Sequence, residues 1–360
     1  MSLKYALIGC GRIAINHFSA AVSNGLDIVG LCDLDIGNIH IMLGKAQTDT
    51  TYALYTDYKA MLSKTRPDLV AIATESGNHA EIALYCIEAG CNVIIEKPIA
   101  LSLKDADKII AAGERKGVCV CACHQNRFNT SVQMMRKALD KGRLGRLLHG
   151  TAHIRWNRGQ SYYTQAPWRG TWAQDGGALM NQCIHNIDLL RWMMGDDVTE
   201  VFAYTDQLNH PYIETEDLGM ALVKFANGSY GIIEGTTNVF PKNLEETLYV
   251  FGEKGTMKAG GQSVNIIEEW RFDDGLDDAA TVKAQTAENP PNVYGFGHSK
   301  LYADVIRAIS TGTKPMVDGQ AGRRALEMVL AIYKSAREGK PVKLPLKDFS
   351  TMDMKNHFRD

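Results

Sequence analysis

The sequence lacks the features that mark membrane, exported or nucleic-acid-binding proteins. No apolar run in its 360 residues reaches the ~18 residues that a membrane span needs. The N-terminus enters a folding pattern at once (LKYALIGCG), with neither a basic leader nor a cleavage site. Lys and Arg number 39 against 41 Asp and Glu, so no basic excess indicates a nucleic-acid footprint. We therefore expect a cytoplasmic globular protein without membrane or nucleic-acid partners.

Cysteine is sparse, with eight residues in the whole chain, and reduced thiols are expected without an export signal. Cys119, Cys121 and Cys123 form a C-x-C-x-C run that is a candidate metal motif. On a strand, however, alternate residues share one face and lie about 7 Å apart. Tetrahedral chelation with metal–sulfur bonds near ~2.3 Å needs closer sulfurs. The sequence therefore predicts structural cysteines and no metal ion.

Residues 1–123 alternate short apolar runs with helical stretches. The runs are apolar throughout, which is typical of parallel strands buried on both faces. The predicted strands are Tyr5–Ile8, Ile28–Cys32, Leu69–Ala73, Val93–Ile95 and Val118–Ala122. The predicted helices are Ile13–Ser23, Ile36–Leu43, Tyr58–Leu62, His79–Ala89 and Leu103–Arg115. This order predicts an α/β Rossmann domain.

Residues 124–360 follow a different pattern and predict a second, α+β domain. A helix at 130–139, a strand at 146–156 and a helix at about 177–194 precede a series of strands between Val198 and Trp270. Turn signals separate these strands, which indicates an open, mainly antiparallel sheet with one packed face. An acidic loop at 272–295 and helices at 299–309 and 322–337 complete the prediction.

A dinucleotide motif, G-x-G-x-x-A, follows the first predicted strand. Gly9 permits a tight turn, Gly11 lets the backbone approach a pyrophosphate, and Arg12 and Ile13 open the following helix. Asp33 ends the second strand, where a carboxylate accepts ribose hydroxyls and repels a 2′-phosphate. The motif predicts NAD rather than NADP as cofactor; the alternative is a plain turn beside a solvated aspartate.

Two further strand ends carry polar residues. Thr74, Asn78 and His79 lie past the strand at 69–73, where ligands bind in open α/β sheets, although Asn78 is equally suited to cap the next helix. Glu96 and Lys97 precede a proline at the end of the next strand. A lysine there is a candidate acid or base, and Glu96 either orients it or contacts the cofactor. An isolated Glu-Lys-Pro is also compatible with a surface ion pair.

The second domain contains Asn181 and His185, four residues apart on a predicted helix and therefore on one face. A neutral His185 is a candidate base for an alcohol proton, with Asn181 holding the hydroxyl. Asp188 follows three residues later and has either His185 or the backbone as its partner. A single helical histidine is also compatible with a purely structural role.

Together, G-x-G-x-x-A, the aspartate after the second strand, E-K-P and G-G-x₃-N-x₃-H resemble the glucose–fructose oxidoreductase/inositol dehydrogenase (Gfo/Idh/MocA) family. The resemblance implies hydride transfer from a sugar or cyclitol carbinol to NAD, with Lys97 and His185 as the catalytic lysine and histidine. Many members have aspartate where this chain has Asn181. Because asparagine takes no proton, His185 or Lys97 must act as the base.

Within this family the chain is similar to the bacterial UDP-N-acetyl-glucosaminuronate 3-dehydrogenases (WlbA-like), through HQNRF, WRGTW, GGALMNQCIHNIDLL, FPKNLEETLYVFGEKGT and VNIIEEW. The similarity implies cofactor contacts from Gln125, Trp168 and Arg169. It implies nucleotide-sugar contacts from Arg158, Tyr163, Lys242 and Asn243, and a homodimer or homotetramer. The alternatives are an inositol or simple-sugar dehydrogenase, a non-catalytic NAD-binding regulator and an enone reductase, the last of which would favour NADPH.

Overall fold

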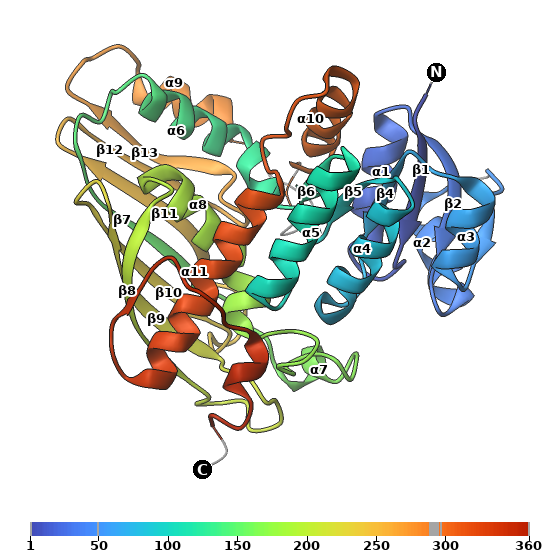
Figure 1. Cartoon of the computed structure of the whole chain (residues 1–360). Coiled ribbons are helices and arrows are strands. Elements are labelled where there is room, and N and C mark those ends of the chain that lie inside the picture. The colour runs from blue at the N-terminus through green and yellow to red at the C-terminus, as the bar shows by residue number, and fades with distance from the viewer. Residues whose placement is uncertain (1, 49, 288–294, 296, 359–360) are drawn as a thin grey trace. The chain divides into compact units, whose positions relative to one another are not determined.

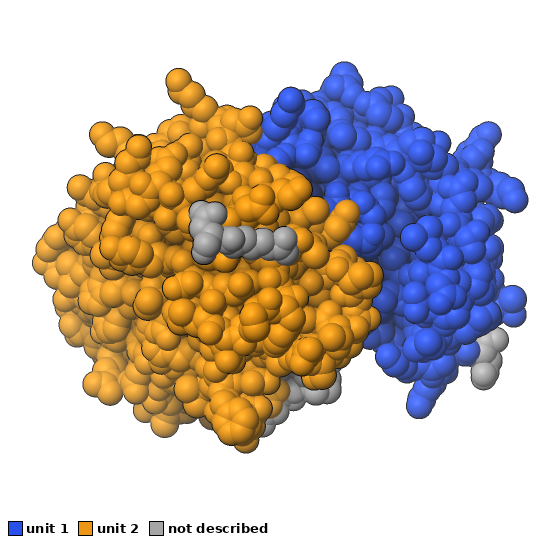
Figure 2. Space-filling model, turned by 90° about the horizontal axis from the view of Figure 1, so that it is seen from below, with its two compact units in different colours: residues 1–124, 298–323 blue, residues 125–297, 324–360 orange. Residues whose placement is uncertain are grey.

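The computed structural model describes residues 2–48, 50–287, 295 and 297–358. The chain divides into two compact units, which Figure 2 colours separately. Unit 1 comprises residues 1–124 and 298–323, and unit 2 comprises residues 125–297 and 324–360. The predicted boundary after residue 123 lies beside the first junction, but residues 298–323 fall in unit 1 rather than with the second domain. None of the described helices is long and apolar enough to cross a membrane.

Unit 1 contains a six-stranded parallel sheet in the order β3-β2-β1-β4-β5-β6 (Figure 1). This is the strand order of the doubly wound dinucleotide-binding fold, so the predicted Rossmann domain is confirmed. The strands are β1 (Lys4–Ile8), β2 (Asp27–Cys32), β3 (Leu54–Tyr55), β4 (Leu69–Ile72), β5 (Asn92–Ile95) and β6 (Val120–Ala122). The helices are α1 (Ala14–Ser23), α2 (Ile36–Ala46), α3 (Tyr58–Thr65), η1 (Ser76–Asn78), α4 (His79–Glu88), α5 (Leu103–Lys116) and α10 (Gly297–Thr311).

Helix α5 illustrates why the sequence pattern located these helices well. The Ser102 side chain accepts a hydrogen bond from the Asp105 N–H at 3.1 Å and caps the first turn. The helix ends at Gly117, whose φ of +66° is in the left-handed region that glycine favours. The strand β3 escaped prediction because two residues carry no periodic signal.

Unit 2 contains an eight-stranded sheet in the order β13-β12-β11-β7-β10-β9-β8-β14. Among these strands β7 and β10 pair in parallel and the other neighbours pair antiparallel, which confirms the predicted α+β domain. The strands are β7 (Leu147–Arg155), β8 (Val198–Asp206), β9 (Leu218–Phe225), β10 (Tyr230–Thr236), β11 (Glu245–Gly252), β12 (Gly255–Gly260), β13 (Ile266–Phe272) and β14 (Val342–Lys343). The helices are η2 (Gln125–Phe128), α6 (Thr130–Asp140), α7 (Gln160–Tyr163), η3 (Leu179–Cys183), α8 (Ile184–Met194), α9 (Ala279–Thr286), α11 (Gly319–Glu338, shared with unit 1) and η4 (Thr351–Met354).

The segment 272–295, predicted to be one long loop, contains helix α9. The Asp278 side chain caps it by accepting the Thr281 N–H at 2.8 Å, a local signal that the acidic composition obscured. Residues 288–294 of that segment lie outside the described residues.

Helix α8 and the π-helix η3 that precedes it pack on the inner face of the unit 2 sheet. Glycines in the strands make this approach possible. A Cβ at Gly219 would lie 2.5 Å from the Leu179 side chain, and one at Gly235 would lie 2.7 Å from Cys183 Sγ. Both distances are shorter than van der Waals contact, so larger residues would displace the helix. The glycines of β9 and β10 therefore determine how closely η3, with Asn181, and α8, with His185, approach the sheet.

Candidate active site

The glycine loop after β1 has the conformation that a dinucleotide requires. Gly9 has φ +89°, and a Cβ there would lie 2.6 Å from the carbonyl of Ala73, so only glycine fits. A Cβ at Gly11 would meet nothing within 4 Å among the described residues, which leaves its backbone open to a ligand. Helix α1 begins at the N-cap residue Ile13 without a side-chain cap, and Arg12 beside it is exposed. No side chain therefore caps this helix N-terminus, which is where the dinucleotide-binding fold binds a pyrophosphate.

Asp33 lies at the carboxyl end of β2, beside the glycine loop. Its Oδ2 accepts the Cys10 N–H at 2.8 Å. Its Oδ1 accepts the Asp35 N–H at 2.9 Å and the Asn38 side-chain amide at 3.0 Å. These bonds fix a half-buried carboxylate at the position where the ribose of a dinucleotide binds. The residues present thus fit NAD, and the negative charge disfavours a 2′-phosphate.

His79, Thr74 and Asn78 follow β4. The buried His79 ring lies between two carbonyl groups, with Nδ1 2.7 Å from Pro98 O and Nε2 3.1 Å from Thr74 O. Burial lowers the pKa of His79. The Asn78 side chain donates to Glu75 and does not cap α4, so the capping alternative is wrong. His79 therefore links the ends of β4 and β5, and direct cofactor contact by these three residues stays a prediction.

Glu96 is buried beneath Lys97 in a hydrogen-bonded cluster. Its Oε1 lies 2.9 Å from His17 Nε2, and its Oε2 accepts the Lys97 N–H at 3.1 Å. His17 Nδ1 lies 2.8 Å from the Tyr302 hydroxyl, and His298 Nε2 lies 3.8 Å from Glu96 Oε1. Burial by itself raises the pKa of Glu96, but the hydrogen bond from His17 and the nearby His298 and Lys97 bring it well below its usual value. Glu96 is thus a carboxylate that fixes the backbone of Lys97.

Cys123 joins this cluster, and the ligand-type atoms of His17, Glu96, Cys123 and His298 lie within 4.8 Å of one another. Two of these atoms already share the His17–Glu96 hydrogen bond. Burial also raises the pKa of the Cys123 thiol well above its usual value, which keeps the sulfur protonated. The arrangement is therefore a hydrogen-bonded network. That the protein holds no metal ion stays a prediction, which metal analysis of the purified protein would test.

In unit 2, Asn181 and His185 are half-buried, whereas all other residues from Asp175 to Arg191 are buried. The predicted α-helix is in fact a π-helix over Leu179–Cys183 followed by α8. Local π-turns are frequent at functional sites. The two residues singled out from the sequence are thus those that this segment leaves accessible.

Two buried acidic residues, one before and one after this segment in the sequence, hold it in place. Asp175 accepts a hydrogen bond from the Asn181 side chain and another from the Gly170 N–H at 2.7 Å. Glu216 Oε1 accepts the Leu179 N–H at 2.7 Å, at the start of the π-helix. Together these carboxyl groups hold the Asn181 side chain and the backbone around it.

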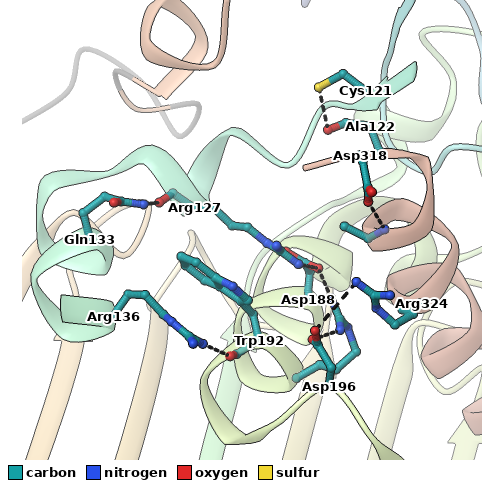
Figure 3. Close-up of polar contacts among 12 residues, drawn as sticks. Cys121, Ala122, Arg127, Gln133, Arg136, Asp188, Trp192, Asp196, Asp318 and Arg324 are labelled. Carbon is teal, nitrogen blue, oxygen red and sulfur yellow. Dashed lines mark hydrogen bonds and ion pairs between the residues drawn. The ribbon is translucent and has the colours of Figure 1, made fainter. Parts of the chain in front are cut away.

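Asp188 has partners other than those considered from the sequence. Its two oxygens accept Arg127 Nε and Nη2, both at 2.7 Å, and Arg191 Nη2 lies 3.2 Å from its Oδ1 (Figure 3). All three side chains are buried. Arg191 also pairs with Asp196. This ion cluster joins η2 to α8, so Asp188 positions the helix of His185.

A second group of cations surrounds Tyr162. The guanidinium carbon of Arg169 lies 4.3 Å from the centre of the Tyr162 ring, and that of Arg158 lies 5.2 Å from it. Arg158 Nη1 donates to Asn243 Oδ1 at 3.0 Å. Gln182, next to Asn181 on η3, donates to the Tyr162 hydroxyl at 3.0 Å. Four of these side chains are half-buried, and Gln182 is buried.

Neither Arg158 nor Arg169 forms an ion pair with a carboxylate in the described part of the chain. Half-buried guanidinium groups that form no ion pair are suited to bind phosphate or carboxylate oxygens, so these two arginines are a candidate anion site. This unit therefore offers positive charge beside the segment that presents Asn181 and His185.

The other predicted residues occupy varied surroundings. Trp168 is half-buried, with the Arg169 guanidinium 4.4 Å from its ring centre. Gln125 is buried, and its Oε1 has no hydrogen-bond partner among the described residues. Tyr163 is buried, with its hydroxyl 3.3 Å from that of Thr237, and burial raises its pKa. Lys242 is exposed. Their cofactor and substrate roles stay predictions.

Comparison with known proteins agrees with both halves of the chain. Residues 3–124 match the NAD-binding Rossmann fold of an oxidoreductase family, Gfo/Idh/MocA, and residues 136–344 match its C-terminal alpha/beta domain. The chain belongs to the Gfo/Idh/MocA oxidoreductase family. It is an NAD-dependent oxidoreductase, as the glycine loop and Asp33 predicted.

Three relatives indicate the range of substrates within the Gfo/Idh/MocA family. The WlbA dehydrogenase of Bordetella pertussis, solved in complex with NADH and UDP-GlcNAcA, is 36% identical, with a TM-score of 0.88 over 96% of this chain and 99% of that chain. D-apiose dehydrogenase of Paraburkholderia graminis is 29% identical over 95% of this chain and 89% of its own. Myo-inositol 2-dehydrogenase of Thermotoga maritima is 23% identical over 95% of this chain and 98% of its own.

Sequence reasoning did not single out several residues that the structure places around the candidate site. Tyr162, Asp175 and Glu216 had no motif of their own, and the predicted Tyr163 is the more deeply buried of the two adjacent tyrosines. The adjacent tyrosines Tyr162 and Tyr163 were a sequence signal for an aromatic surface at this site. Only the fold decides which of the two rings lies against the arginines at positions 158 and 169.

Proposed function

We propose that this oxidoreductase oxidises a ring hydroxyl of a nucleotide sugar to a ketone, specifically the 3-hydroxyl of a UDP-N-acetyl-hexosamine or its uronate. The observation that carries the proposal is the pair of uncompensated guanidinium groups, Arg158 and Arg169, around Tyr162. A diphosphate or uronate supplies the missing negative charge, whereas inositol or a simple neutral sugar does not. The 36% identity to a protein solved with UDP-GlcNAcA supports the same substrate class.

The residues that the family resemblance implies have distinct roles in the proposed reaction. The NAD⁺ held by the glycine loop and Asp33 supplies the hydride acceptor. His185, assisted by Lys97, accepts the hydroxyl proton, because Asn181 cannot. The Lys97 ammonium and the Asn181 side chain hold the substrate oxygen as negative charge develops on it. The Glu96 carboxylate positions Lys97 through its backbone N–H.

The test is the absorbance of reduced nicotinamide at stoichiometric enzyme, mixed in turn with UDP-N-acetyl-glucosaminuronate, UDP-N-acetylglucosamine, myo-inositol and glucose. High enzyme concentration detects one turnover even when the cofactor is not released. We expect a signal with a UDP-sugar and none with inositol or glucose. A signal with inositol or glucose alone would overturn the substrate class. Silence with all four would favour a sugar outside this set or a non-catalytic NAD-binding regulator.

Arg158→Gln provides a second arm. Losing a charge-assisted contact to the anionic part of the substrate should raise the KM for the UDP-sugar about tenfold or more. Arg271→Gln is the matched control, because Arg271 is exposed and pairs with Glu269 on the neighbouring surface. An unchanged KM in Arg158→Gln would remove the anion site from the proposal.

A further inference from the structure

Three buried polar side chains of unit 2 converge beside the helix of His185. Asn126 comes from η2, Asn186 from α8 and Glu246 from β11. The Asn126 side-chain amide donates to Glu246 Oε1 at 3.3 Å, and that of Asn186 donates to the carbonyl of Thr247 at 3.4 Å. All three side chains are at most 3% exposed. We call this set the Asn126–Asn186–Glu246 cluster.

Each member of the cluster keeps one polar atom without a partner among the described residues: Asn126 Oδ1, Asn186 Oδ1 and Glu246 Oε2. A buried polar atom without a hydrogen bond costs about 1–3 kcal/mol, so three together need an explanation other than fold stability. Glu246 also makes no ion pair with a cation within the described chain. Such a group of open hydrogen-bonding atoms is what a polar ligand would satisfy.

The Arg127–Asp188–Arg191 ion cluster fixes η2 and α8, the two elements that carry Asn126 and Asn186. Arg127 follows Asn126 directly, and Asp188 follows Asn186 by two residues. The bidentate Arg127–Asp188 pair, visible in Figure 3, joins the two elements. The cluster is therefore preorganised, which reduces the entropic cost of binding a ligand.

The chemistry of the open atoms favours a neutral group that both donates and accepts. Burial raises the pKa of Glu246 to about 8, so the carboxyl group is mainly protonated at neutral pH. Because Asn126 donates to Oε1, the proton resides on Oε2 and is a free donor. The two asparagine oxygens are acceptors. A secondary amide matches this set, with its carbonyl facing the carboxyl proton and its N–H facing an asparagine oxygen.

We propose that the Asn126–Asn186–Glu246 cluster binds the acetamido group of the substrate sugar and selects N-acetylated nucleotide sugars over their 2-hydroxyl analogues. This inference rests on the proposed function. In an N-acetyl-hexosamine the acetamido carbon adjoins the carbon that carries the 3-hydroxyl. In the protein Glu246 lies close enough to Arg158, which the proposed function assigns to the anionic part of the substrate, for that charge to act on it. A hydroxyl group at the same carbon is too short to satisfy both the carboxyl proton and an asparagine oxygen.

The test compares kcat/KM for UDP-N-acetyl-glucosaminuronate with that for UDP-glucuronate, which has a hydroxyl in place of the acetamido group. We expect the wild type to prefer the N-acetylated sugar at least about 100-fold, equivalent to two hydrogen bonds at roughly tenfold each. Glu246→Met and Asn186→Leu should each reduce this preference below about tenfold, mainly by slowing the N-acetylated substrate. Glu246→Gln, which retains one donor, should keep more of it than Glu246→Met.

Glu245→Gln is the matched control, because Glu245 precedes Glu246 on β11 but pairs with Arg155. Its substrate preference should equal that of the wild type. Because Glu246→Met also removes the acceptor of the Asn126 amide, its thermal midpoint is measured beside that of Glu246→Gln, which keeps an acceptor there. An active wild type whose preference is unchanged in both Glu246→Met and Asn186→Leu would overturn this inference alone. A wild type inactive with both UDP-sugars would overturn the proposed function and this inference with it.

Discussion

Among single residues, Lys97 is the group whose loss should separate chemistry from binding. Lys97→Ala is expected to lower turnover at least ~100-fold, the usual scale for a lost acid–base group. NAD binding, measured by titration calorimetry, should be retained, because the glycine loop and Asp33 are untouched. Lys104→Ala, at an exposed position of α5, is the control and should behave as the wild type. Near-normal turnover by Lys97→Ala would refute its assignment.

Glu216 predicts a pH-dependent contribution to stability. Burial raises the pKa of Glu216 to about 8, so the folded protein holds a proton that the unfolded chain releases near the ordinary glutamate pKa of 4.5. Between these values the unfolded state binds fewer protons, and the free energy of unfolding therefore falls as pH rises. Glu216→Gln removes this titration. Its stability relative to the wild type should rise by at least about 1 kcal/mol between pH 5 and pH 8.

Thermal unfolding at several pH values would measure this difference. Glu253→Gln, at an exposed turn between β11 and β12, should show no change in slope against the wild type. A Glu216→Gln curve parallel to that of the wild type would mean that Glu216 is ionised in the folded protein.

At the scale of elements, the Arg127–Asp188–Arg191 cluster determines how η2 is attached to α8. Asp188→Asn leaves the buried Arg127 guanidinium without its carboxylate, while Arg191 keeps its pair with Asp196. Removing one partner of a buried pair costs about 3–5 kcal/mol. We expect the thermal midpoint to fall by more than about 6 °C. Asp140→Asn is the control, since Asp140 forms an exposed pair with Arg136 one turn apart, worth less than about 1 kcal/mol. Equal midpoints for the two variants would contradict this account.

For the whole molecule, the outer face of the unit 2 sheet predicts self-association. Tyr204, Met220, Leu222, Tyr230 and Ile232 project from β8, β9 and β10 and are 41–64% exposed. In register, Leu222 lies opposite Ile232 and Tyr204 lies opposite Met220, so the apolar residues adjoin across the strands. Such a patch is unusual for a monomer. We expect the homodimer or homotetramer that the family resemblance implies.

Light scattering after size exclusion would measure the molar mass of the wild type and of Leu222→Glu. The variant should have a lower mass than the wild type, because a charge in an apolar interface is left without a partner. Ile41→Glu, at an exposed apolar position of α2, is the control and should leave the mass unchanged. A wild type with the mass of one chain would refute the expectation.

Local patterns accounted for most of the elements. Continuous apolar runs located β1, β2, β4 and β5 to within a residue or two, because strands buried on both faces are apolar throughout. Turn signals between the strands located β9 and β10, whose burial alternates in the structure because one face of the sheet is packed and the other is not. The π-helix at Leu179–Cys183 and helix α9 were not predicted, since a carboxyl group from another segment fixes the start of the first and a single cap that of the second.

The sequence by itself determined the Rossmann domain, the NAD site at Gly9, Gly11 and Asp33, and the choice of Asn181 and His185, because these depend on short-range spacing and on backbone conformations that few residues adopt. Only the tertiary structure decided which acids and cations meet. The pairing of Asp188 with Arg127, the two arginines around Tyr162 and the burial of Glu246 beside Asn126 all join segments distant in the chain. Such contacts depend on how distant segments pack against one another, and local sequence patterns do not encode which segments meet.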